Sequence, residues 1–339
     1  MHIAIAGCSG VIGPHLIQWV LANSEATVVG CDAGYERLGD LLRSDRFAYY
    51  FADESNSDQL LRQLVGDADV LVDLRALEYA GDAGPPGSPR GGARAQMLLA
   101  AACADAKTRL VHVLSANMSS GADAPAAERV ESPVAVGHAT GRGGSRAGSD
   151  GAEPELLRGD ASQVIRDYGT FSDLQFVVVR LSDVLGDQLE VVPRSSSLSS
   201  LERLRDAFLM GTDDLIELGG ADLQKRNFVY VMDAASALGR IAVGRVAALP
   251  AVALEVGNPG IYMTRSDVAR TVLEAYKARY WDRHSPTPRL AEVATDDCAP
   301  GASAPLIDIS LAQSLLDWHP RWPLTGAIDD ALPRLLGGH

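Results

Sequence analysis

Three glycines near the start of the chain stand where a backbone turn could hold a phosphate group. Gly7, Gly10 and Gly13 lie in HIAIAGCSGVIGPHLIQWV, between an expected strand and an expected helix. Gly7 permits a tight turn, Gly10 lets the backbone approach a pyrophosphate, and Gly13 lets the helix pack closely on the strand; the amino end of the helix favours the anion. A purely structural glycine turn is the alternative. The dinucleotide site that we predict here also includes the loop residues Ser9, Val11 and Ile12.

Carboxylates after the next two expected strands could complete that site. Asp32 follows ATVVGC, where it would accept hydrogen bonds from an adenosine ribose; a surface turn residue is the alternative. Because Asp32 would repel a 2′-phosphate, NADH is favoured over NADPH as the NAD(P)H cofactor, although Arg37 is near enough in sequence to weaken the preference. Asp53 and Glu54 follow the third strand, where Asp53 would accept from the adenine amino group or cap a helix.

These residues need a sheet to hold them, and the chain has the pattern of one. Apolar segments rich in β-branched residues alternate with segments of helical period, as in HIAIA then PHLIQWVLA, and DVLVDL then ARAQMLLAAACADA. This alternation is typical of a parallel sheet covered on both faces. We predict an α/β fold, a doubly wound parallel sheet of the Rossmann type, over residues 1–185. Residues 186–339 are predicted to form mainly a smaller C-terminal substrate-binding lobe, with residues 226–245 returning to the first domain.

Between residues 119 and 153 the alternation gives way to Gly, Ala, Ser, Pro and charged residues. Such a segment is too polar to bury and too long for an ordinary connection. We therefore predict a flexible lid there.

The charge and apolar content argue against several classes of function. A formal net charge of −14 repels phosphate backbones and anionic membrane surfaces, so we expect no nucleic-acid partner. No apolar run reaches the roughly 18 to 20 residues of a membrane span, and Met1 leads directly into a strand. The four cysteines lack CxxC spacing and no metal-spaced cluster occurs, so no metal site is expected. These observations favour a cytoplasmic protein that acts on a small molecule.

Several segments, in order along the chain, match motifs of a known family. GCSGVIG resembles a GxxGxxG turn, DVLVDLRAL resembles a strand ending in His-Leu-Ala-Ala, and RLVHVLSANMSSG resembles one ending in Ser-Ser-Ala. Later, RNFVYVMDAASAL resembles Arg-Asp-Phe-Val-His-Val-Asp-Asp-Val-Ala, and LLDWHPRWPL resembles a closing Leu-Gly-Trp-x-Pro. Over nearly its whole length the chain thus resembles the extended short-chain dehydrogenase/reductase family, which includes sugar-nucleotide epimerases and dehydratases. The resemblance implies NAD(P) binding and leaves a homodimer open as the assembly.

The resemblance also implies where catalytic groups should lie. Members use Asn, Ser, Tyr and Lys, the last two as YxxxK, to supply a proton or stabilise developing charge. In this chain Ser115 stands at the serine position, Gly91 falls near the asparagine position, and Pro154 and Arg158 stand at the other two. Neither Pro154 nor Arg158 can act as an acid near neutral pH. Ser115 is therefore the one catalytic residue implied, with a packing role at the strand end as the alternative.

Further cofactor contacts follow from the same resemblance. Leu74, Arg75 and Ala76 come directly after the fourth expected strand, beside the cofactor. Arg75 replaces a small residue, so it would reach a phosphate or the substrate, or form a surface ion pair. Ser182 replaces a proline and would bring a hydroxyl near the nicotinamide. His112, within a strand, is expected to be a packed residue more than a proton donor.

Three functions fit this pattern. The first is an NAD(P)H-dependent ketoreductase for an aromatic polyketide in antibiotic biosynthesis, since the chain also resembles atypical, tyrosine-lacking family members that reduce an angucyclinone carbonyl. A phenol beside the ketone would hold the developing oxyanion, while the enzyme contributes positioning. The second is a non-catalytic NAD(P)-binding sensor or accessory protein. The third, a sugar-nucleotide epimerase or dehydratase, needs a base that the lost pair would have supplied.

Overall fold

A computed structural model of the chain describes residues 1–52, 57–75, 93–116, 169, 172–189, 199–244, 251–280, 286–293 and 303–337. Its centre is a seven-stranded sheet in the order β10-β6-β5-β4-β1-β2-β3, in which all neighbouring strands are parallel. The strands are β1 (His2–Ala6), β2 (Thr27–Asp32), β3 (Phe47–Phe51), β4 (Val70–Asp73), β5 (Arg109–Ser115), β6 (Phe176–Leu181) and β10 (Ala251–Val256). The predicted doubly wound α/β class is confirmed.

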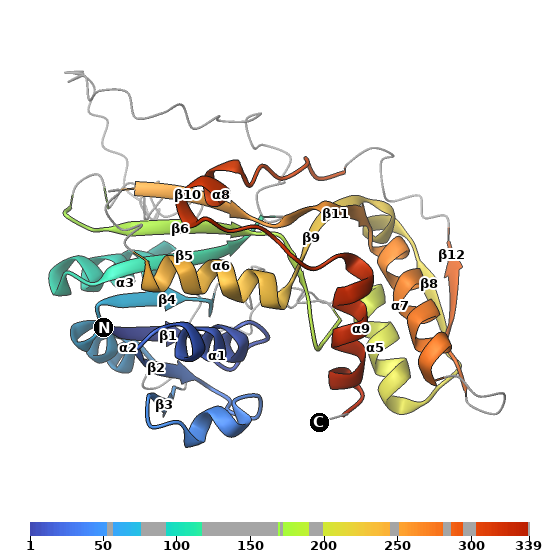
Figure 1. The fold of residues 1–339 in the computed structure, drawn as a ribbon, viewed down its shortest axis with the longest axis horizontal. Helices are drawn as coiled ribbons and strands as arrows, with labels where there is room; N and C mark the ends of the chain where they lie inside the picture. Colours follow the sequence, from blue (N-terminus) through green and yellow to red (C-terminus); the bar gives the residue numbers. More distant parts are fainter. Residues whose placement is uncertain are drawn as a thin grey trace, which may run out of the picture.

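Helices cover both faces of this sheet, as Figure 1 shows. On one face, α1 (Gly13–Asn23) packs against α6 (Val231–Val243). On the other face, α2 (Ser57–Asp67) packs against α3 (Ala93–Ala106). Strands buried on both faces explain the nearly continuous apolar runs of the sequence.

The α1–α6 contact depends on one glycine and is joined to the sheet by one arginine. A Cβ on Gly239 of α6 would lie 2.0 Å from the Trp19 ring of α1, so the two helices approach too closely for any larger residue. Arg109, buried at the start of β5, donates hydrogen bonds to the carbonyls of Ile241, Ala242 and Gly244. A cation at these carbonyls satisfies the end of α6 and complements its dipole.

A second group of elements lies beside the carboxyl ends of the sheet strands, on the right of Figure 1. Its strands form two small sheets, in the orders β11-β9-β7 and β12-β8. The elements are β7 (Asp183–Leu185), α5 (Ser200–Met210), β8 (Leu215–Leu218), η5 (Gly220–Leu223), β9 (Lys225–Tyr230), β11 (Asn258–Thr264), α7 (Arg265–Tyr280), β12 (Arg289–Glu292) and α9 (Leu324–Leu335). Two helices lie outside this group: α8 (Ser310–Leu316) packs against β10 and α6, and the short helix η1 (Gly39–Arg43) precedes β3. The division at residues 185 and 186 stays a prediction.

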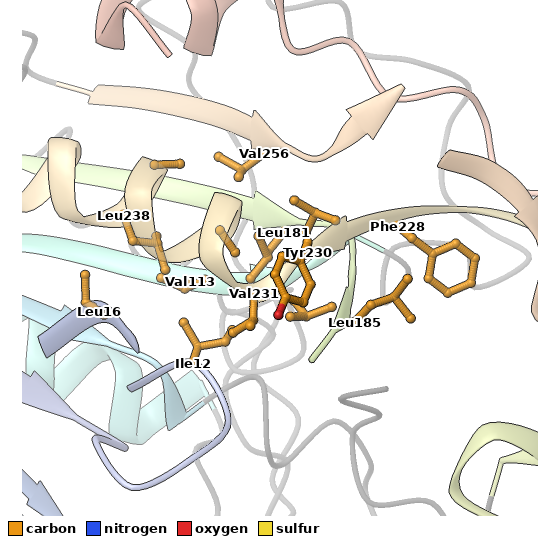
Figure 2. Packing of buried hydrophobic residues seen from close by; sticks show 14 of the residues in the cluster. Ile12, Leu16, Val113, Leu181, Leu185, Phe228, Tyr230, Val231, Leu238 and Val256 are labelled. Carbon is orange, nitrogen blue, oxygen red and sulfur yellow. The ribbon is translucent and has the colours of Figure 1, made fainter. Parts of the chain in front are cut away.

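One apolar core joins the two groups of elements. Figure 2 shows Ile12 and Leu16 of the α1 end facing Val113 of β5 and Leu238 of α6. The same core continues to Phe228 on β9 and to other buried residues of the second group. Packing across the boundary therefore fixes the second group against the sheet edge where the predicted site lies.

Candidate cofactor and active site

The glycine turn lies at the carboxyl end of β1, and two of its positions require glycine. The topological switch of the sheet lies at β1, because β2 pairs with one side of β1 and β4 with the other, and ligands of such sheets bind at the carboxyl ends there. Gly7 follows β1 with φ +78°, and its N–H donates to the carbonyl of Cys31 at 3.0 Å. A Cβ on Gly13 would lie 2.1 Å from the carbonyl oxygen of Cys8. Glycine is therefore required at Gly7 by conformation and at Gly13 by space.

Asp32 lies against this turn, where the sequence places it. Its Oδ2 accepts a hydrogen bond from the Ser9 N–H and its Oδ1 accepts one from the Ala33 N–H, both at 2.8 Å. The Tyr49 hydroxyl donates to the backbone carbonyls of Asp32 and Gly34, at 2.7 and 2.8 Å, and so fixes the end of β2. A carboxylate anchored beside a glycine turn, with lone pairs left for further donors, fits the ribose of a dinucleotide.

A buried charge cluster lies beside the turn, at the end of β4. Asp73 is fully buried, and its Oδ1 accepts a hydrogen bond from Nε of Arg75 at 2.8 Å. His112 Nδ1, on the neighbouring β5, lies 3.3 Å from Asp73 Oδ2. Burial alone would raise the pKa of Asp73, but the charge of Arg75 and the nearby His112 hold that pKa well below its usual range. Asp73 is therefore ionised at neutral pH and holds the guanidinium in place.

Arg75 is the member of the cluster nearest the predicted cofactor. Its backbone N lies 3.2 Å, and its Cγ 3.4 Å, from where a Cβ on Gly7 would stand. Leu74, which precedes it, is buried and donates its N–H to the carbonyl of Ala6. The structure thus places Leu74 and Arg75 against the turn, and their contact with a cofactor stays a prediction. The sequence left open a surface ion pair for Arg75. Its partner Asp73, however, is fully buried.

The two candidate serines lie on adjacent strand ends. Ser115, the last residue of β5, is half-buried and is aligned with Leu181 of β6. Ser182 follows β6 and donates its N–H to the carbonyl of Val256. Its Oγ is buried, has no hydrogen-bond partner in the described part of the chain, and would lie 2.2 Å from a Cβ on Gly257. Their proximity to a nicotinamide stays a prediction.

Several residues predicted from the sequence fall outside the described residues. They are the cofactor candidates Asp53, Glu54 and Ala76, the lid at 119–153, and Gly91, Pro154 and Arg158 at the catalytic positions. The loss of the tyrosine and lysine nevertheless does not depend on counting positions. The chain has three lysines, Lys107, Lys225 and Lys277, and the residues four positions before them are Cys103, Ala221 and Leu273. No YxxxK pattern therefore exists anywhere in the sequence.

Sequence reasoning missed two groups of charged residues. Asp73 closes the apolar run VLVD in phase with buried Leu71, and this period-two placement could have marked it as an inward carboxylate. Oδ2 of Asp183, which is also buried, lies 3.5 Å from Nη1 of Arg226 and 3.7 Å from Nη2 of Arg265. These three residues come from β7, β9 and α7, and nothing in the local sequence pairs them. Two cations thus share one buried carboxylate, in the residue that follows Ser182.

The described residues lack two features, a cluster of metal ligands and a membrane-spanning helix. Within the described ranges, no three His, Cys, Asp or Glu side chains are grouped so that they could hold a metal ion. Nor does that part of the chain contain a helix with the length and apolarity needed to cross a bilayer.

Comparison with known proteins gives the fold but no family assignment. No protein-family model matches the sequence. PbgP3 from Burkholderia pseudomallei is similar in structure, with a TM-score of 0.73 and 20% identity over 99% of this chain and 96% of that one. UDP-glucuronic acid 4-epimerase from Bacillus cereus, solved with UDP-glucuronic acid and NAD, has a TM-score of 0.68 and 19% identity over 99% of both chains. dTDP-glucose 4,6-dehydratase from Bacillus anthracis, solved with NAD, has a TM-score of 0.66 and 15% identity over 98% of this chain and 96% of that one. The likeness covers both groups of elements.

Proposed function

We propose that the protein is an NAD(H)-dependent oxidoreductase of the extended short-chain dehydrogenase/reductase type, acting on a small molecule. The observation that carries the proposal is the joining of the glycine turn to Asp32 through the Ser9 N–H. NAD complexes of the Bacillus cereus epimerase and the Bacillus anthracis dehydratase, which share this fold, support it. Gly7, Gly10 and Gly13 would admit the pyrophosphate and Asp32 would accept from the ribose. The bound nicotinamide would supply or take up the hydride.

The residues of the chain would act mainly by positioning. Ser115, at the end of β5, would donate a hydrogen bond to the substrate oxygen and orient the carbonyl. Arg75, held by Asp73, would place a fixed positive charge beside the turn. Since no YxxxK pair exists, the chain offers no matched tyrosine to donate the final proton. Reduction would therefore depend on a substrate that stabilises its own alkoxide.

For the substrate, we propose an aromatic ketone flanked by a phenol, of the angucyclinone polyketide type. The phenol would donate an internal hydrogen bond to the oxygen as hydride reaches the carbon. Its proton would then pass to the alkoxide to complete the alcohol, and water would reprotonate the phenolate. Alignment of the reacting carbons alone can contribute about 7 to 11 kcal/mol. The missing acid pair supports this substrate class. The similar epimerase and dehydratase, in contrast, are named for nucleotide sugars.

A nucleotide sugar is the second candidate. The similar structures include a UDP-glucuronic acid 4-epimerase and a dTDP-glucose 4,6-dehydratase, and the similarity extends over the second group of elements. The cations Arg226 and Arg265 near Ser182 would also suit an anionic substrate. Against it stands the absence of YxxxK, because an unactivated sugar hydroxyl needs a base to release its proton.

One panel of assays separates these candidates. The protein is incubated with NADH and hydroxylated aromatic ketones, and the absorbance of the reduced nicotinamide is followed. In parallel it is incubated with NAD⁺ and UDP-glucuronic acid or dTDP-glucose, and the sugar products are separated chromatographically because epimerisation leaves no net change in the cofactor. We expect NADH oxidation with the ketones. Sugar conversion would favour the second candidate, and tight cofactor binding without any turnover would favour a sensor or accessory protein.

A further inference from the structure

The loop after β2 brings a second carboxylate to the predicted ribose site. Glu36 Oε2 accepts a hydrogen bond from the Tyr35 N–H at 3.0 Å and lies 2.8 Å from where a Cβ on Gly34 would stand. The Ser9 hydroxyl oxygen lies 3.6 Å from that same point. Since the Ser9 N–H is bonded to Asp32, both carboxylates lie near Ser9, at the turn that would hold the adenosine ribose.

Tyr49 of β3 holds the loop segment that precedes Glu36. The Tyr49 hydroxyl donates to the carbonyls of both Asp32 and Gly34, so both ends of the loop segment are tied to one side chain. Burial raises the pKa of Tyr49 to about 12, and the charges of Asp32 and Glu36 are among those that add to the rise. Both carboxylates therefore act on the same small region.

The cation in this loop, Arg37, also acts on the Asp187 carboxylate. Burial would raise the pKa of Asp187, which follows β7, but His15 and then the charges of Arg334 and Arg37 lower it. The Nε2 atom of His15 lies 3.2 Å from Asp187 Oδ2. The charge of Arg37 thus also acts on a carboxylate of the segment after β7.

We propose that Glu36 is a specificity-determining residue of the cofactor site, acting with Asp32 to exclude a 2′-phosphate. A 2′-phosphate brings a charge of about −1.5 to −2 to a position flanked by two carboxylates, and each repulsion adds to the other. A cofactor with a free 2′-hydroxyl donates to the carboxylates instead. We expect Arg37 to relieve little of this repulsion, since its charge also acts on Asp187. This inference rests on the proposed dinucleotide site and strengthens the preference for NADH.

Binding of two cofactor fragments tests the proposal without any turnover. Calorimetry gives the dissociation constants of ADP-ribose and of 2′-phospho-ADP-ribose for the wild-type chain, D32N and E36Q. The control is E25Q, which removes an exposed carboxylate before β2, away from the carboxyl edge of the sheet. The ratio compared is the dissociation constant of 2′-phospho-ADP-ribose divided by that of ADP-ribose. We expect E36Q to lower this ratio by about fivefold or more, which is the effect of removing one charge a few ångströms away in water. E25Q should leave the ratio unchanged.

The outcomes distinguish a failure of the Glu36 proposal from a failure of the dinucleotide site on which it rests. If ADP-ribose binds and E36Q leaves the ratio unchanged, the role of Glu36 is overturned while the dinucleotide site stands. If the wild-type chain binds neither fragment, the proposed function itself fails. A raised salt concentration provides a second measurement on the unaltered protein, because screening should lower the ratio; a constant ratio would contradict a charge-based selection. R37Q should change the ratio by less than about twofold, and a selective loss of 2′-phospho-ADP-ribose would show that Arg37 holds the phosphate.

Discussion

The buried carboxylate of Asp73 holds the guanidinium of Arg75 by two contacts, from Nε to Oδ1 at 2.8 Å and from Nη2 to Oδ2 at 3.3 Å. Asp73 has no exposed surface, whereas Arg75 is about one third exposed, at 31%. The pair thus connects the interior of the sheet to the turn at Gly7. A buried charge of this kind is costly unless it is paired.

Asp73→Asn should destabilise the protein strongly. Removal of the charge leaves Arg75 without its carboxylate, and breaking a buried pair typically costs about 3 to 5 kcal/mol. Urea unfolding measures the change, with Asp40→Asn as the control, because Asp40 and Arg43 form an ion pair that is 90% and 84% exposed and worth about 1 kcal/mol or less. Equal losses in the two variants would show that the Asp73 pair has no special weight.

Acid should remove the advantage of Asp73. Its folded pKa lies below the unfolded value of about 3.9, so the carboxylate contributes stability that is fully present above that value and is lost as the pH falls through the folded pKa. We therefore expect the difference in unfolding free energy between the wild type and Asp73→Asn to shrink below about pH 4. Unfolding curves at several pH values give this difference; one that stays constant, or grows in acid, would contradict the depressed pKa.

Gly13→Ala should damage the turn. The added methyl would lie 2.1 Å from the carbonyl oxygen of Cys8, so α1 must shift, and such overpacking costs about 1 to 3 kcal/mol or more. Gly66→Ala is the matched control, because Gly66 lies in α2 with no atom within 4 Å of the new methyl and helix propensity should make that variant as stable or up to about 1 kcal/mol more stable. Thermal unfolding and ADP-ribose affinity provide the two readouts; an unaffected Gly13→Ala would refute the close approach.

Ser115→Ala should slow ketone reduction without abolishing it. Loss of one hydrogen-bond donor to the developing oxyanion lowers the rate by about a hundredfold, while positioning of the substrate is retained. Single-turnover oxidation of NADH measures the effect, with Ser314→Ala on α8 as a distant control. A fall to the uncatalysed rate would identify Ser115 as the essential proton donor.

Local patterns were sufficient to place the glycine turn and the strands around it. The glycine spacing, the apolar strands around it and Asp32 at the end of β2 were predicted because the turn, the helix start and the strand period all depend on neighbours in sequence. The fold class followed from the same alternation. β7, with three residues, and β12, with four, are too short to show a period, and they were not predicted.

Long-range charge pairing explains most of what the sequence could not reveal. Asp183 meets Arg226 and Arg265 only after three elements converge. His112 was expected to pack, and it is fully buried, but its position beside Asp73 depends on the pairing of β4 with β5. The homodimer stays a prediction, as does the lid.

The place of β10 in the large sheet has a consequence for the synthesis of the chain. β10 pairs with β6, yet β8, β9 and α6 separate them in the sequence, so the edge of β6 has no partner until residue 256 has left the ribosome. Arg109 likewise cannot donate its hydrogen bonds to the carbonyls at the end of α6 until that helix has been synthesised. An exposed strand edge is prone to pairing with other chains. The nascent chain should therefore be most vulnerable to aggregation while the second group of elements is being made, and a fragment ending near residue 185 should need a chaperone to stay dispersed.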